Sequence, residues 1–189
     1  MLKDFILKNR SYRRFDEEFI IDREVLIELV DLARFSASGA NSQPLKYILS
    51  AEKQKNDLIF PHLAWAGYLA DWPGPAKGER PSAYIIILED TGIRKSPGCD
   101  QGIAVQSILL GAVEKGLGGC IIGSIQRKAL AKTLNIEPQY EILLVLALGK
   151  PKEKVVIETV GADGDIKYWR DSEGAHHVPK RSLDEIIIG

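Results

Sequence analysis

The segment from Asp100 to Leu117 is the part of this sequence that most constrains the fold. It predicts a helix, and apolar side chains occupy much of the circumference of that helix: Ile103, Ala104, Ile108, Leu110 and Ala112. A helix that is apolar on most sides is stable only when other elements cover it. We therefore expect a central helix, and Gly111 within it lets a neighbouring element come close.

Continuous apolar runs predict buried strands around this helix. Ala83 to Leu88 and Ile142 to Leu148 are apolar at successive positions, which is typical of strands covered on both faces. Leu45 to Leu49 and the very short Gly119 to Gly123 predict two more strands. Because helices and strands are interspersed without strict alternation, we expect an α+β fold.

Other segments predict helices and a hairpin. The apolar stripe from Val25 to Ala33 begins behind Asp22, a candidate N-cap, and Ser124 is a candidate cap for a helix over Gln126 to Leu134. Glu52 to Trp72 predicts one or two helices. Asp163-Gly164 is a turn signal, so we expect the strands on either side of it to pair as a hairpin: Val155 to Val160 and Ile166 to Arg170.

Composition and charge restrict the classes of function. Residues 1–189 show no repeat, linker or low-complexity stretch, so we expect one domain. Lys and Arg number 25 against 26 Asp and Glu, and a net charge of -1 does not favour nucleic acid or acidic lipid as a partner. No segment reaches the roughly 20 apolar residues of a membrane span, and the charged N-terminus is unlike a signal peptide. We expect a cytoplasmic protein without a membrane partner.

Metal and disulfide chemistry are not expected. Cys99 and Cys120 lie far apart and match no metal-binding spacing, whereas an iron–sulfur cluster needs about four thiolates. Their scarcity does not suggest an oxidising compartment. His176 and His177 are adjacent, so they share no face of a helix or strand, and no third ligand stands at a metal-site spacing.

Basic residues near both ends of the chain are candidates for anion binding. Arg10, Ser11 and Arg13 directly follow the first predicted helix, and arginine presents a planar fork of donors that suits phosphate oxygens. Lys180 and Arg181 form a second basic pair. Taken alone, the first group favours a solvated basic loop and the second an exposed tail.

The loop from Ser36 to Pro44 is a candidate contact for a heterocycle. Gly39 lets backbone amides approach a ligand closely, and the amides of Asn41 and Gln43 suit an imide edge. The alternative is an ordinary helix-to-strand connection. The glycine-rich run from Gly116 to Ser124 matches neither a Walker loop nor a Gly-x-Gly-x-x-Gly motif, so a nicotinamide Rossmann site is not supported.

Three aromatic residues have a helical spacing. Trp65, Tyr68 and Trp72 stand at i, i+3 and i+7, which predicts one stripe of a helix. Such a stripe is either part of the core or, beside the Pro- and Gly-rich loop up to Pro81, a lid over a pocket.

Taken in order, these pieces resemble the nitroreductase family of FMN enzymes. The resemblance is carried by Arg10-Ser11-x-Arg13-x-Phe15, by the loop Ser36 to Pro44, by Asp100 to Gly123 and by Leu146 to Pro151 with Lys180-Arg181-Ser-Leu. It implies a three-layer α-β-α fold with a mixed, mainly antiparallel central sheet. It also implies an intertwined homodimer, in which the apolar end at Ile186 to Ile188 would be buried on the partner.

The resemblance implies residues for the FMN site. Arg10, Ser11 and Arg13 would hold the phosphate, with Lys180 or Arg181 adding charge. Ser38, Gly39 and Asn41 would touch the flavin from the partner subunit. The stretch beside the ring would consist of Cys120, Ile121, Ile122 and Gly123.

The implied activity is transfer of hydride from NAD(P)H to a nitroaromatic, a quinone or a similar conjugated acceptor by ping-pong turnover. Trp65 and Tyr68 are candidate substrate-side residues, and no residue is singled out as a catalytic acid or base. The chain departs from the family where Leu45 replaces the aromatic residue that usually follows the proline, and in the loop from Trp72 to Pro81. Two alternatives are a flavin-binding protein without nicotinamide turnover and a flavin enzyme with dehalogenase-like chemistry.

Overall fold

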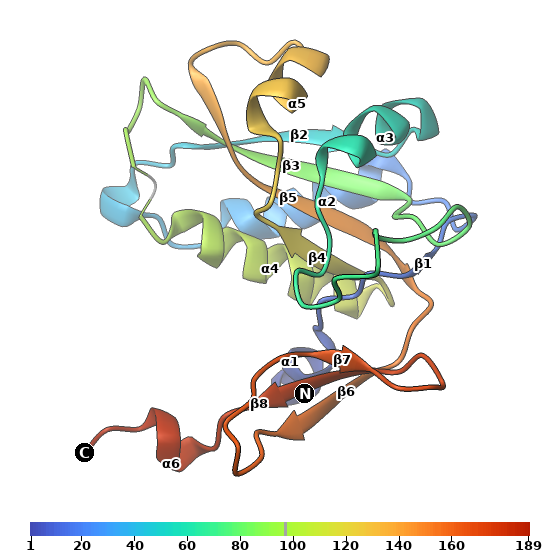
Figure 1. Ribbon diagram of the computed structural model, residues 1–189. Coiled ribbons are helices and arrows are strands. Elements are labelled where there is room, and N and C mark those ends of the chain that lie inside the picture. The colour runs from blue at the N-terminus through green and yellow to red at the C-terminus, as the bar shows by residue number, and fades with distance from the viewer. Residues whose placement is uncertain (97) are drawn as a thin grey trace.

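A five-stranded sheet forms the centre of the protein, and a three-stranded sheet lies beyond one end of it (Figure 1). The computed structural model describes residues 1–96 and 98–189. The helices and 3-10 turns are α1 (Leu2–Lys8), α2 (Arg23–Arg34), η1 (Gly39–Asn41), α3 (Lys53–Ile59), η2 (Phe60–His62), α4 (Asp100–Glu114), α5 (Arg127–Thr133) and α6 (Leu183–Ile186). The strands are β1 (Phe15–Asp16), β2 (Leu45–Ser50), β3 (Ala83–Asp90), β4 (Gly118–Ile122), β5 (Tyr140–Pro151), β6 (Val155–Thr159), β7 (Trp169–Arg170) and β8 (His176–Lys180).

The central sheet is built around the long strand β5. The strand order is β1-β5-β3-β2, and β4 pairs with β5 next to β1. These pairings are all antiparallel. The parallel pairing of β6 with β8 occurs in the small sheet, whose order is β6-β8-β7.

Helices cover both faces of the central sheet (Figure 1). Along β3, Ile85 and Ile87 pack with α2 and α4 in one core cluster, whereas Ile86 packs with α3 and α5 in a second cluster. All three isoleucines are fully buried, as the uninterrupted apolar run predicts. The arrangement is a three-layer α-β-α architecture and confirms the α+β fold class.

The central helix is α4, and it ends at Glu114. Ala104, Val105 and Ile108 are buried, but Ile103 stays 41% exposed, so one side of the helix is open in the single chain. A Cβ atom at Gly111 would lie 2.3 Å from Leu32 Cδ1. The glycine therefore leaves room for the Leu32 side chain of α2 against α4.

The aromatic residues at positions 65, 68 and 72 do not share a helix, so that prediction was wrong. Helix α3 ends at Ile59, and η2, which contains Pro61, ends at His62. A proline lacks the amide hydrogen that would continue a helix. Beyond it, Leu63 bridges Ile125 and the amide of Ala64 donates to the carbonyl of Ser124 at 2.9 Å. Long-range pairing has replaced the helix that the spacing predicts.

Two further local predictions were wrong. The turn at Asp163-Gly164 forms, with Gly164 N donating to Gly161 O at 3.0 Å, but β6 and β7 do not pair as a hairpin. The later strand β8 lies between them and pairs with both. Helix α5 begins after Gln126 rather than after Ser124, whose carbonyl is already bonded to Ala64.

Candidate functional site

A cavity of about 350 Å³ lies where the end of α1, helix α4, strand β4 and the small sheet meet. Five residues predicted from the sequence line it: Arg10, Ser11, Arg13, Ile121 and Lys180. Arg10 and Lys180 are 170 residues apart in the sequence. The fold therefore brings together two basic groups whose role as anion ligands was uncertain when each was considered alone. Asn9, Gln106 and Gly119 complete the wall beside α4 and β4.

The charge of this cavity is strongly one-sided. It is lined by the cations Arg10, Arg13 and Lys180, and no Asp or Glu is among the described residues that line it. Arg10 Nη2 donates to the carbonyl of Ile6 at 2.7 Å. Arg10 Nε is buried and has no hydrogen-bond partner within residues 1–96 and 98–189. Buried donors of this kind are stabilised by an acceptor, so the cavity is suited to an anion.

Arg13 is fixed by contacts from the small sheet. Its Nη1 donates to Ser11 O at 3.2 Å and lies 3.0 Å from His176 Nε2, and its guanidinium stands 4.7 Å from the centre of the Tyr168 ring. Burial of His176, reinforced by the charge of Arg13, lowers the pKa of that imidazole to about 4. The ring is therefore neutral at pH 7, and because arginine only donates, Nε2 is the acceptor and Nδ1 carries the hydrogen.

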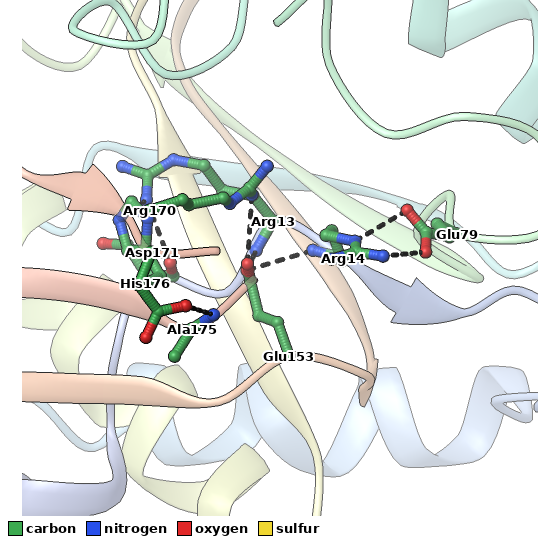
Figure 2. A network of polar contacts seen from close by, with 9 residues as sticks. Arg13, Arg14, Glu79, Glu153, Arg170, Asp171, Ala175 and His176 are labelled. Carbon is green, nitrogen blue, oxygen red and sulfur yellow. Dashed lines mark hydrogen bonds and ion pairs between the residues drawn. The ribbon is translucent and has the colours of Figure 1, made fainter. Parts of the chain in front are cut away.

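Glu153 organises the backbone of the arginine segment (Figure 2). This carboxylate is 1% exposed and accepts hydrogen bonds from the amides of Arg13 and Arg14, the latter at 3.1 Å. Its second oxygen accepts from Arg170 Nη2 at 3.0 Å. The Arg14 side chain turns to Glu79, with contacts of 2.7 and 2.5 Å, and lowers the pKa of that carboxyl. Arg14 is thus occupied elsewhere, while Arg13 faces the cavity.

The small sheet adds three lining residues that sequence reasoning missed: Tyr168, His176 and Val178. His176, Val178 and Lys180 alternate along β8, so they share one face of the strand. A strand assignment for residues 176–180 could have predicted this grouping.

The two histidines face opposite sides of β8, as their adjacency predicts. Both ring nitrogens of His177 are bonded to carboxylates, Nδ1 to Glu158 and Nε2 to Asp171 at 3.1 Å. These hydrogen bonds, first that of Asp171, raise the pKa of His177. Among the residues that the structure describes, no group of three or more His, Cys, Asp or Glu side chains is arranged to hold a metal ion.

Strand β4 presents only one of its predicted residues to the cavity. Ile121 is 45% exposed and lines it, whereas Cys120 and Ile122 point into the core on the other face. Burial raises the pKa of the Cys120 thiol to about 11. Gly123 and Arg181 do not line the cavity, and Arg181 Nη1 donates instead to Glu185 of α6 at 3.1 Å.

The loop with Ser38, Gly39 and Asn41 is not part of this cavity in the single chain. Ser38 Oγ donates to Asp100 Oδ2 at 2.6 Å, and Gly39 N donates to Asp100 Oδ1 at 3.0 Å. Asn41 is exposed and its φ is 52°, a left-handed conformation that also occurs at Ala40 and Gln43. Such clustered conformations cost free energy and are often found at functional sites.

The predicted substrate-side aromatics occupy different environments. Trp65 is 9% exposed and packs 6.0 Å from the Phe60 ring in the core. Tyr68 is 52% exposed, and its ring lies 4.9 Å from that of Tyr168. Tyr68 does not line the cavity itself, but it contacts Tyr168, which does. Trp72 lies 4.2 Å beneath the guanidinium of Arg170.

The fold and this cavity define an α+β protein with a cation-lined cavity built from two segments that are far apart in the sequence. The model of the nitroreductase family matches residues 6–150, and the chain belongs to that family. Membership implies an oxidoreductase. Throughout the described part of the chain, helices are too short or too polar to cross a membrane.

Solved structures show the same fold at low sequence identity. A nitroreductase family protein from Streptococcus pneumoniae TIGR4 is 16% identical with a TM-score of 0.72, and the match covers 100% of both chains. An FMN-dependent nitroreductase from Clostridium difficile R20291 is 20% identical with a TM-score of 0.63, over 79% of this chain and 87% of the other. A third protein, from Exiguobacterium sibiricum 255-15, was crystallised with FMN. It is 16% identical with a TM-score of 0.67, over 81% of this chain and 89% of that one. No curated protein sequence matches the chain.

Proposed function

We propose that this protein is an FMN-dependent oxidoreductase that passes hydride from NAD(P)H to a nitroaromatic, a quinone or a similar conjugated acceptor. The observation that carries the proposal is the cavity with three cations, no lining carboxylate among the described residues and an unpartnered buried donor on Arg10. A phosphate dianion matches this set of donors. The FMN-dependent and FMN-containing relatives support flavin as the bearer of that phosphate.

Arg10, Ser11, Arg13 and Lys180 would hold the phosphate. Each charge-assisted hydrogen bond contributes about 1.5–3 kcal/mol, so together they would account for much of the binding free energy. His176 keeps Arg13 in place as a neutral acceptor, and Glu153 holds the backbone of the same segment. These two residues would set the geometry of the clamp without adding a competing negative charge inside the cavity.

Bound FMN would supply the hydride chemistry, because the redox reaction belongs to the cofactor. The task of this chain is to bind and orient the ring and to exclude water from it. Ile121 offers an exposed apolar surface beside the cavity, and Cys120, Ile122 and Gly123 would act through their backbone, since two of these side chains face the core. The nicotinamide would leave before the acceptor binds, as ping-pong turnover requires.

A homodimer would complete the site. Ser38, Gly39 and Asn41 lie outside the cavity of their own chain, so we propose that they reach the flavin of the partner subunit. Ile186, Ile187 and Ile188 are 58%, 63% and 98% exposed, on an end of the chain that extends away from the rest of the molecule (Figure 1). Apolar ends of this kind are normally covered, and a second subunit would cover them.

Tyr68 is proposed on the substrate side, where its contact with Tyr168 places it next to the cavity wall. Trp65 would contribute indirectly, because its side chain is buried in the core cluster against which Phe60 packs.

The purified protein tests the proposal directly. We expect a yellow protein whose flavin absorbance bleaches anaerobically with NADH or NADPH and recovers when a quinone is added. Bound flavin that no nicotinamide reduces would leave a flavin-binding protein rather than a reductase. A colourless protein that takes up no FMN would refute the assignment.

The double variant Arg10→Ala, Arg13→Ala tests the location of the phosphate. We expect FMN affinity to fall by several kcal/mol, because the dianion loses paired donors. The matched control is Arg23→Ala, Lys128→Ala at exposed positions of α2 and α5, which removes the same charge from residues that do not line the cavity. Equal FMN binding by both double variants would show that the phosphate is held elsewhere.

A further inference from the structure

A second cavity in the described part of the chain is separate from the cation-lined one. It has a volume of about 700 Å³ and shares no lining residue with the first cavity. Three segments enclose it: the turn at residues 17–20 after β1, helix α3 with Phe60, and residues 77–82 leading into β3. A volume of this size is within the range of about 300–1,000 Å³ that is usual for small-molecule sites.

Aromatic and aliphatic side chains form much of its wall. Phe19 and Ile20 stand at the mouth, where they are 39% and 78% exposed, while Tyr84 is only 1% exposed at the inner end. Phe60, the first residue of η2, also lines the cavity. Apolar residues left open around a concave surface favour a ligand with an apolar body.

The charged residues of this cavity balance one another. Glu17, Glu18 and Asp57 oppose Lys53, Lys77 and Arg80. Two of the carboxylates are already bonded, Asp57 to Lys53 at 2.6 Å and Glu17 to the amide of Gly78. A cavity with this balance is unlike the first one, which has an excess of three positive charges, and it does not favour a phosphate dianion.

Two cations of this cavity, Lys77 and Arg80, form no ion pair with another described residue, and Arg80 is the less exposed of the two. The Arg80 guanidinium lies 4.2 Å from the centre of the Phe60 ring. Arg80 Nε and Ser82 Oγ are both buried without partners in the same part of the chain. Nearby Asn56 bonds to Ser50 and to the carbonyl of Ser82, each at 2.7 Å, so its amide does not satisfy them.

We propose that this cavity is a second ligand site, which takes a small aromatic carboxylate. The ring would pack against Phe60, Phe19 and Tyr84, and the carboxylate would pair with the guanidinium of Arg80, for which a planar anion is the best-matched partner. One negative charge is enough to satisfy Arg80, and the balanced charges at the mouth disfavour a more highly charged ligand. The site requires neither flavin nor a second subunit.

Calorimetric titration of the FMN-saturated protein with 2-naphthoate tests the proposal, with neutral 2-naphthamide as the matched ligand. We expect one naphthoate per chain and at least tenfold weaker binding of the amide. Arg80→Met should abolish the preference for naphthoate. Ile20→Glu, at an exposed position where misfolding is not expected, should weaken naphthoate binding by placing a like charge at the mouth.

Control variants separate this site from the flavin cavity. Arg10→Ala, Arg13→Ala should leave naphthoate binding unchanged, as should the surface substitution Arg23→Ala. Retained FMN absorbance in Arg80→Met and Ile20→Glu would show that both are folded. The proposal is overturned if naphthoate does not bind at millimolar concentration, if binding survives both Arg80→Met and Ile20→Glu, or if it is lost in the Arg10 and Arg13 variant.

Discussion

Arg13 and His176 are separated by 163 residues, and Arg13 Nη1 lies 3.0 Å from His176 Nε2. This contact joins the segment after α1 to the strand β8 and fixes one wall of the cation-lined cavity. It exists only while the imidazole is neutral, because a protonated ring would place two cations against each other. The pH dependence of folding should therefore report on this pair.

The folded protein should lose stability in acid. The pKa of His176 is about 4 in the folded protein against 6.5 ordinarily, so the unfolded chain binds the proton first as the pH falls. Folding should lose up to about 3 kcal/mol between pH 6.5 and pH 4 from this residue, at 1.36 kcal/mol per pKa unit. Urea unfolding at both pH values should show a smaller loss in His176→Gln. An identical loss in the variant would mean that other groups control the acid limit.

His177 should titrate in the opposite sense. Its pKa is raised by Asp171 and Glu158, so its contribution to stability is present below the ordinary histidine pKa and is lost as the pH rises through the raised value. NMR titration of the imidazole carbons should resolve two adjacent histidines, one with a midpoint above 6.5 and one near 4. Asp171→Asn should bring the upper midpoint down and leave the lower one in place. Coinciding midpoints in the unmodified protein would contradict the opposite environments of the two rings.

Removal of the Glu153 carboxylate should be strongly destabilising. Glu153→Ala would leave Arg170, which is 16% exposed, without its partner and would free the amides of Arg13 and Arg14. Breaking a buried pair from one side costs about 3–5 kcal/mol. Chemical denaturation should show a loss of this size, whereas Glu137→Ala at an exposed position should change stability by less than about 0.5 kcal/mol. A small effect of Glu153→Ala would mean that water replaces the carboxylate.

Asp100→Asn should loosen the loop at residues 38–43. Both carboxylate oxygens accept hydrogen bonds there, from Ser38 Oγ and Gly39 N, and an amide supplies only one acceptor. Losing a hydrogen bond to Asp100 should cost about 1–3 kcal/mol of stability in this loop. The effect should be seen at Ala40, Asn41 and Gln43, whose left-handed conformations are strained. Amide hydrogen exchange over residues 39–43 should accelerate in the variant and not in the surface control Asp31→Asn. Unchanged exchange would show that the loop holds its shape without Asp100.

The parts of the fold that could be predicted from the sequence are those with a local signal. The apolar run from Ala83 to Leu88 became the doubly covered strand β3, and the apolar segment after Asp100 became the central helix α4. The stripe at Trp65, Tyr68 and Trp72 failed because Leu63 and Ala64 pair with a segment sixty residues further on. Periodicity within a short window carries no information about such partners.

Some residues of the candidate site could be predicted from the sequence, and others could not. Arg10, Ser11 and Arg13 form a local motif in the sequence, and the fold places them in one cavity with Lys180. The place of Tyr168 and His176 in this cavity was not predicted, because β8 inserts between β6 and β7, a long-range pairing that no turn signal indicates. Asp163-Gly164 favours a simple hairpin of the segments on either side of it, in which β8 has no part.

Arg10 and Lys180 lie on opposite walls of the cavity and are synthesised far apart in time, so these walls form in a fixed order. Domains emerge from the ribosome N-terminus first at about 5–20 residues per second, so the arginine segment is made many seconds before β8. The main sheet can pair up to β5 in that interval, but the small sheet cannot form until its central strand, β8, has been synthesised. The cavity can thus close only once β8 has been made, and a nascent chain or one truncated before β8 would carry Arg10 and Arg13 without the wall opposite them.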